Sequence, residues 1–230
     1  MTPIPQAADS GMHVGVQYVG TTKHDLQFLR RHGVTHMDAT PEDFELDTLQ
    51  RHRDEAAAAG VSLEMIHIPI AKSITLAQNP QRDREIEGLH RIIENAGKAG
   101  LRGLNYNFYV GTFARTEETT GRGGARCSTF RFDEYDNETL TEAGVVGRDE
   151  VFERIGYFIE RVIPVADENR VQFACHLNDP PAPVLRGVER WNYPVFDGLK
   201  RFIELSDSPY HGFNFCCGVA SEGLADPGAE

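Results

Sequence analysis

The sequence lacks any apolar run of roughly 18 residues, the length that a transmembrane helix needs. Its first residues, MTPIPQAADSG, lack the basic and apolar regions of a signal peptide. Basic residues are also in deficit, because 23 Lys and Arg stand against 35 Asp and Glu and give a net charge of -12. That charge argues against nucleic acid and against an anionic membrane surface as partners. We therefore expect a cytoplasmic protein with no membrane and no nucleic-acid partner.

Cysteine is scarce as well. The four cysteines, Cys127, Cys175, Cys216 and Cys217, have no spacing typical of a disulfide framework, and the adjacent pair is poorly placed to bond to itself. A chain of 230 residues can bury a core without disulfides or structural metals. We expect a reducing compartment and a single domain over residues 1–230.

The sequence does contain a regular alternation of short apolar runs and longer amphipathic segments. It predicts strands at residues 13–19, 34–39, 61–68, 101–110, 170–177 and 211–218, and helices at residues 23–32, 44–59, 82–99, 149–165 and 195–206. Such alternation indicates a parallel sheet covered by helices.

A glycine separates a helix from the next strand at three places, Gly33, Gly60 and Gly100. This repetition of one β/α unit favours an α/β fold of the (β/α)8 TIM-barrel type. The alternative is a doubly wound sheet, which usually has a Gly-rich turn after its first strand; Gly20-Thr21-Thr22-Lys23 is a poor version of that turn.

A long polar insertion occupies roughly residues 111–148. Its GRGGAR segment, residues 121–126, is Gly-rich, but a phosphate-binding loop needs a helix directly after it, and here more loop follows. A mobile lid over the site is favoured, and a solvated flap without a partner is the alternative. Four arginines could bring positive charge to an anionic substrate: Arg115, Arg122, Arg126 and Arg131.

Polar side chains stand where several predicted strands end, which is where TIM barrels place their active sites. His176 and Cys216 follow neighbouring strands and could converge on one metal ion, and three prolines at 180, 181 and 183 would stiffen the loop after His176. Each residue also has a structural interpretation. A strand histidine, such as His67, is commonly a hydrogen-bonded core residue, a buried cysteine behaves as a small hydrophobe, and Asp179 before a proline can be a turn residue.

The motifs at these strand ends resemble those of the mannonate dehydratase family, metal-dependent barrels of the xylose-isomerase-like group. The resemblance runs from about Leu29 to Gly218. It rests on LNYNF (104–108), on Ala114-Arg115-Thr116, on HLNDPP (176–181) and on Cys216-Cys217-Gly218. It implies removal of water from D-mannonate, giving 2-keto-3-deoxy-D-gluconate, in carbohydrate metabolism and hexuronate catabolism.

The resemblance also implies a divalent metal, typically Mn2+, with Mg2+, Co2+ and Zn2+ as alternatives. His176 and Cys216 match two of the family's metal ligands, and the other two, a histidine and an aspartate, come from its seventh and eighth strands. A metal bound to the substrate carboxylate would stabilise the charge that develops when the α-proton leaves. Asp179 is the candidate for handling the proton or for orienting the ligand histidine or a bound water. The candidate substrate-binding residues are Tyr106, Asn107, Arg115 and Asn178.

The sequence departs from the family pattern at several points. The family usually has HPDDPP where Leu177 and Asn178 stand here, and CTG where Cys217 replaces the threonine. These changes leave open another sugar acid, an isomerase or epimerase reaction, or a non-catalytic binding protein or barrel remnant. Family members are commonly oligomeric, so a homo-oligomer is compatible with the resemblance.

Only six strands are predicted, whereas a closed barrel of this type needs eight. We therefore expect a partial sequence with an open, C-shaped barrel and an incomplete metal site. Its first and sixth strands would be open edges, which invite pairing with another chain.

Overall fold

The structure is a computed structural model that describes residues 13–111 and 113–229. Its centre is a six-stranded sheet in the order β1-β2-β3-β4-β7-β10, in which every neighbouring pair is parallel. The strands are β1 (Gly15–Val19), β2 (His36–Ala39), β3 (Ser62–His67), β4 (Gly103–Asn107), β7 (Gln172–His176) and β10 (His211–Asn214). The six predicted strands are confirmed, with shorter bounds.

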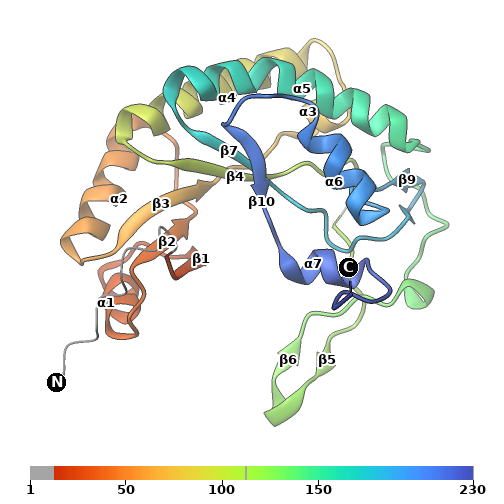
Figure 1. Cartoon of the computed structure of the whole chain (residues 1–230), viewed down its shortest axis with the longest axis horizontal. Helices are drawn as coiled ribbons and strands as arrows, with labels where there is room; N and C mark the ends of the chain where they lie inside the picture. The colour runs from red at the N-terminus through yellow and green to blue at the C-terminus, as the bar shows by residue number, and fades with distance from the viewer. Residues whose placement is uncertain (1–12, 112, 230) are drawn as a thin grey trace.

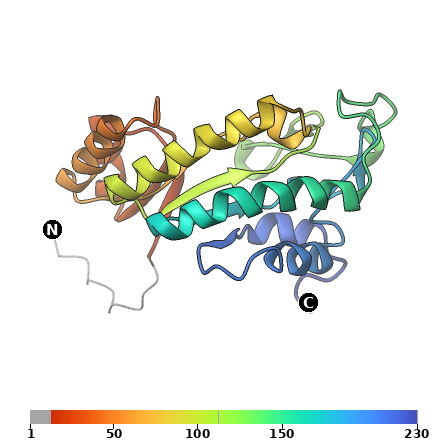
Figure 2. The same cartoon turned by 90° about the horizontal axis from the view of Figure 1, so that it is seen from above.

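Helices cover the outer face of this sheet (Figure 1). The predicted ones are α1 (Lys23–Arg31), α2 (Leu46–Ala58), α4 (Gln81–Ala99), α5 (Arg148–Asn169) and α6 (Val195–Ile203). Figure 2 shows α4 and α5 lying side by side along the sheet. Among the described residues, no helix is long and apolar enough to cross a membrane.

The sheet curves into an open arc rather than a closed barrel (Figure 1). β1 and β10 lie at its two ends, and within residues 13–111 and 113–229 they pair only with β2 and β7 respectively. The expectation of a C-shaped partial barrel is confirmed over these residues. The arc has two faces, which we call the helix-side face and the concave face.

The repeated unit seen in the sequence has a common backbone geometry. Gly33, Gly60 and Gly100 follow α1, α2 and α4 with φ angles of 79°, 77° and 77°. This left-handed conformation is strained for residues with a Cβ, so glycine ends each helix and turns the chain toward the next strand.

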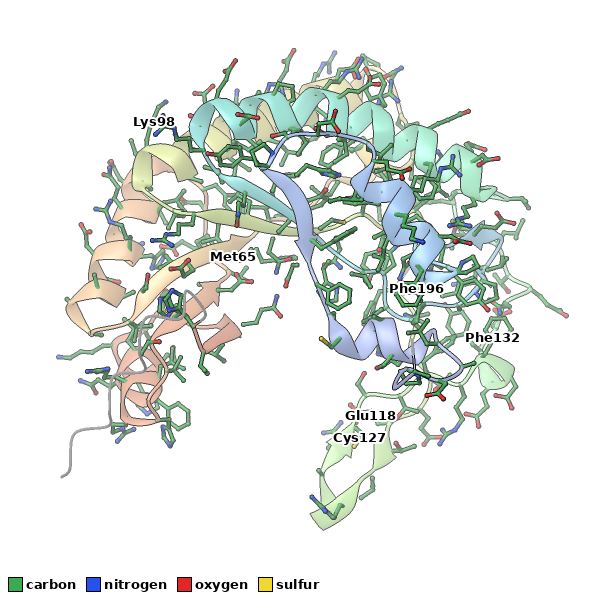
Figure 3. The ribbon with its side chains drawn as sticks, viewed as in Figure 1. Met65, Lys98, Glu118, Cys127, Phe132 and Phe196 are labelled. Atoms are coloured by element: carbon green, nitrogen blue, oxygen red, sulfur yellow. The ribbon has the colours of Figure 1, made fainter. Side chains whose placement is uncertain are left out.

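Alternate residues of each strand face opposite sides of the sheet. On the helix-side face, the Tyr106 ring packs 4.4 Å from Phe173 and 5.7 Å from Phe158 of α5, measured between ring centroids. On the concave face, Asn107 contacts His176, its register partner on β7. Met65 of β3 is also on the concave side (Figure 3). The apolar core therefore lies between sheet and helices, while polar side chains collect in the concavity.

The insertion carries a short hairpin, β5 (Thr119–Thr120) with β6 (Arg126–Cys127), and two 3-10 turns, η1 (Arg122–Gly124) and η2 (Phe132–Glu134). The Gly-rich segment forms the exposed hairpin turn, and no helix follows it directly. The geometry of a phosphate-binding loop is therefore absent from this described segment. A second hairpin, β8 (Val184–Leu185) with β9 (Val188–Glu189), follows β7.

Two short helices were not predicted. α3 (Lys72–Thr75) precedes α4, and α7 (Cys217–Glu222) occupies residues expected to be the end of the sixth strand and a loop. The sixth strand stops at Asn214 rather than Gly218. The chain turns into a helix there because Cys216 acts as its N-cap, with its Sγ accepting a hydrogen bond from the Val219 amide.

Candidate functional site

His176 is the last residue of β7, at the carboxyl edge of the sheet. Its Nδ1 lies 2.7 Å from the carbonyl oxygen of Leu177 and 3.3 Å from the side-chain nitrogen of Asn107. The shorter contact fits an Nδ1–H that donates to the carbonyl, which leaves the Nε2 lone pair available. Metal-binding histidines are commonly oriented in this way, with the second ring nitrogen donating to a carbonyl or carboxylate.

Cys216 lies two residues beyond Asn214, the register partner of His176 on β10. The Val219 amide donates to its sulfur at 3.5 Å, and the thiolate is the form of a cysteine that binds metals. The donor set thus fits a metal in kind. It is incomplete in number, because the described residues include no group of three or more His, Cys, Asp or Glu side chains placed to hold a metal ion.

Arg115 and Asp179 are brought together from the insertion and from the loop after β7. Arg115 Nη2 donates to Asp179 Oδ2 at 2.5 Å, its Nε donates to Ser128 Oγ at 2.7 Å, and its Nη1 donates to the Ala114 carbonyl at 2.8 Å. Three of the five guanidinium N–H groups therefore have hydrogen-bond partners among the described residues, and the other two have none there. The ion pair also fixes the start of the insertion against the β7 loop.

The backbone of Asp179 is also held by hydrogen bonds. The Tyr109 hydroxyl accepts a hydrogen bond from the Asp179 amide at 3.1 Å and lies 3.4 Å from its carbonyl oxygen, to which it donates. Burial raises the pKa of Tyr109, so the hydroxyl keeps its proton. This arrangement makes Asp179 a rigid partner for Arg115.

Glu222, at the end of α7, is a member of this region that the sequence did not reveal. Partial burial, and then the charge of Asp179, raise the pKa of its carboxyl group, while Arg115 acts in the opposite direction. Its segment was predicted to be loop, so no periodicity indicated that it would turn back toward Asp179.

Two predicted substrate-binding residues need correction. Tyr106 is fully buried on the helix-side face, because it lies one residue away from the positions of β4 that face the concavity. Asn178 is 2% exposed; its side-chain nitrogen donates to the Phe108 carbonyl at 3.1 Å, and its own carbonyl accepts from Asn192. Both side chains brace the protein interior, where a substrate does not reach them.

A polar cluster on the concave face of β1 to β4 was also not predicted as a site. Asp38 Oδ2 accepts hydrogen bonds from the side-chain nitrogens of Asn105, at 2.9 Å, and Gln17, at 3.3 Å. Burial raises the pKa of Asp38, against the effect of these two donors and of nearby His67. Burial also lowers the pKa of His67, and the neighbouring His176 lowers it further, against Asp38. We call Gln17, Asp38 and Asn105 the amide–carboxylate cluster.

Comparisons with known proteins agree on one family. The model of the D-mannonate dehydratase (UxuA) family matches residues 26–148 and 130–226. A mannonate dehydratase of Thermotoga petrophila is 30% identical over 207 residues, which cover 75% of this chain and 57% of that protein. One from Shouchella clausii is 28% identical, over 80% of this chain and 60% of its own length.

Solved structures show the same fold. The mannonate dehydratase of Streptococcus suis serotype 2 superposes with a TM-score of 0.79 at 22% identity, over 91% of this chain and 65% of the other. D-psicose 3-epimerase of Clostridium cellulolyticum superposes with a TM-score of 0.62 at 10% identity, again over 91% and 65%. The chain therefore spans less than two thirds of the length of each of these relatives.

Proposed function

The chain belongs to the D-mannonate dehydratase family, and from this premise we propose that it acts on D-mannonate, removing water to give 2-keto-3-deoxy-D-gluconate. The observation that carries the proposal is the family match, which covers β2 to β10 and both strand ends that hold His176 and Cys216. The activity is that of a carbon–oxygen lyase in carbohydrate metabolism, specifically hexuronate catabolism. A cytoplasmic setting and a homo-oligomeric assembly belong to the same proposal.

We assign a divalent metal, Mn2+ in the first place, to His176 Nε2 and the Cys216 thiolate. When bound, the metal would stabilise the negative charge that develops on the substrate carboxylate as the α-proton leaves. A thiolate is a soft ligand and does not by itself select manganese over zinc. The hydrogen bond from Nδ1–H to the Leu177 carbonyl holds the imidazole ring in place.

Arg115 is the residue that we assign to the substrate carboxylate. Its two remaining N–H groups can donate to a carboxylate, and such charge-assisted bonds are roughly twice as strong as neutral ones. Asp179 acts as a positioning residue, since its carboxylate and the Ser128 hydroxyl fix the plane of the guanidinium. This role differs from direct proton handling, because the Asp179 carboxylate is already engaged by Arg115.

The reaction is tested with a panel of aldonic acids incubated with the full chain and Mn2+, Mg2+, Co2+ or Zn2+. We expect a 2-keto-3-deoxy acid from D-mannonate, and a loss of at least about tenfold in turnover efficiency for Arg115→Ala. Arg126→Ala is the matched control, because Arg126 is exposed on the hairpin and pairs with Glu118. A keto or epimeric sugar without loss of water would replace the dehydratase proposal with an isomerase or epimerase. Binding of D-mannonate without any product would indicate a non-catalytic binding protein, which the incomplete donor set of the described residues allows.

Metal binding is tested separately by elemental analysis of purified protein. His176→Ala and Cys216→Ser should each lower the bound metal, whereas the exposed-residue controls His24→Ala and Cys127→Ser should not. If the metal content of all four variants equals that of the unsubstituted protein, the assignment of these ligands is wrong.

A further inference from the structure

The amide–carboxylate cluster lies on the concave face at the opposite end of the sheet from β10. Asp38 is the register partner of Met65, and Met65 is the register partner of Gly103, so all three positions face the same side. Figure 3 shows Met65 on the concave side of the arc. The hydrogen bonds of Asp38 to Gln17 and Asn105 then place the whole cluster on that face.

The hydrogen bonds within the cluster fix the orientation of both amides. Asp38 is 8% exposed, and its Oδ2 accepts one N–H from each amide, so the amide oxygens of Gln17 and Asn105 point away from that oxygen. Gln17 is the exposed member. Its Oε1 and its second N–H give the concave face one fixed acceptor and one fixed donor.

The cluster also contains hydrogen-bond acceptors that are not satisfied within the described residues. Among the residues that the structure describes, Asp38 Oδ1 and Asn105 Oδ1 are buried side-chain oxygens with no hydrogen-bond partner. Buried acceptors without a donor are costly and uncommon in native proteins. The group that the cluster presents to a ligand in the concavity is therefore the exposed amide of Gln17, with these buried oxygens behind it.

The chemistry of the cluster selects the kind of group that enters. A hydroxyl both donates and accepts, which matches the donor and the acceptors present. A carboxylate is a poor match, because it offers no donor and would face Asp38. A cationic group lies instead at Arg115, on the insertion, where it pairs with Asp179.

We propose that Gln17, held in position by Asp38, binds the hydroxyl-bearing tail of the sugar acid and so sets the direction in which the substrate lies. The acid end points to Arg115 and to the ends of β7 and β10, and the polyol end points to β1 and β2. This inference rests on the proposed function for the identity of the acid, but not for the recognition of the hydroxyls. Gln17 is the specificity-determining residue and Asp38 its positioning residue.

Three ligands distinguish the binding of the carboxylate end from the binding of the hydroxyl-bearing tail. D-mannonate has both groups, D-mannitol has the hydroxyls but no carboxylate, and D-glycerate has a carboxylate with a short tail. Binding of each to the full chain is measured by ligand-observed NMR and calorimetry. Gln17→Ala should weaken D-mannonate and D-mannitol by about tenfold and leave D-glycerate unchanged. Arg115→Ala should weaken D-mannonate and D-glycerate and leave D-mannitol unchanged.

Three further variants, two at Asp38 and one control, test the positioning role and show whether the effect is specific to Gln17. Asp38→Asn keeps the shape and one carbonyl acceptor, so its loss of D-mannitol binding should be smaller than that of Asp38→Ala. Gln27→Ala is the matched control, since Gln27 is an exposed glutamine on α1. Circular dichroism of each variant checks that it is folded; Gln17 is exposed, so its truncation removes no core contact.

The outcomes separate this inference from the proposed function. If D-mannitol binds and depends on Gln17 while neither acid binds, the hydroxyl site stands and the dehydratase proposal fails. If both acids bind and depend on Arg115 but Gln17→Ala leaves D-mannonate and D-mannitol unchanged, the hydroxyl site is wrong and the proposed function stands. A protein that binds none of the three ligands overturns both.

Discussion

The two faces of the same strands differ sharply in chemistry. On β4, Tyr106 is fully buried among aromatic rings, while its neighbours Asn105 and Asn107 face the concavity, where Asn105 donates to Asp38 and Asn107 contacts His176. On β7, Cys175 lies with Tyr106 on the helix-side face, and His176 follows it on the other. Neighbouring residues of one strand therefore face opposite sides of the sheet. We assign a structural role to the residues on the helix-side face and a functional role to those on the concave face.

This difference shows how the fold divides its tasks. Burial raises the pKa of the Cys175 thiol to about 12, so this cysteine stays protonated and chemically inert. Cys216, beyond the end of β10, has a backbone amide donating to its sulfur instead. Stability should thus depend on the helix-side face, and ligand binding on the concave face.

The largest expected contrast is in the free energy of unfolding. Phe158 is fully buried, with ring centroids 5.4 Å from Phe108 and 5.9 Å from Phe173, so Phe158→Ala should lower the stability by about 3–5 kcal/mol. Asn107→Ala removes one partly buried contact on the concave face, and should lower the free energy of unfolding by no more than about 1 kcal/mol. Urea denaturation monitored by circular dichroism measures both. Equal losses would mean that the two faces do not divide the roles in this way.

A change in pH is expected to have a smaller effect on the free energy of unfolding. Burial lowers the pKa of His211 below its ordinary value of 6.5, although the hydrogen bond to the Phe202 carbonyl acts in the opposite direction. As pH falls through about 6.5, the unfolded chain takes up a proton that the folded protein does not, so the folded state loses stability toward acid. The loss from one such group is at most about 1.4 kcal/mol per pH unit.

The measurement is the free energy of unfolding from pH 7.5 down to about pH 5. His211→Gln should flatten this dependence on pH, whereas His24→Gln, at a side chain that is 82% exposed, should leave it unchanged. An unchanged slope in His211→Gln would show that burial of this imidazole is not coupled to folding.

The sequence predicted the fold well because its signals are local. Each apolar run became a strand, and the glycines at 33, 60 and 100 marked where helices end. The short helix α7 was missed because six residues that include Gly218 carry no clear helical period. The helix α5 extends to Asn169, beyond the predicted end at residue 165.

The site was only partly predictable because it depends on which face a residue takes and on long-range pairs. The sequence offers His176, Asn107, Arg115 and Asp179 as candidates, but the ion pair that joins the last two crosses 64 residues and leaves no local signal. Tyr106 was misassigned because a strand end alone does not say which face a residue occupies. The hydrogen bond from Asn105 to Asp38 links residues 67 apart, which no motif announces.

The claim that the concave face binds the ligand is tested most directly by NMR of the side-chain amides during titration with D-mannonate. The account predicts saturable shifts for Gln17 and Asn107, with little change for Asn95 and Asn169, whose side chains donate to carbonyls at the helix layer. Saturable shifts confined to Asn95 and Asn169, with Gln17 and Asn107 unmoved, would contradict it.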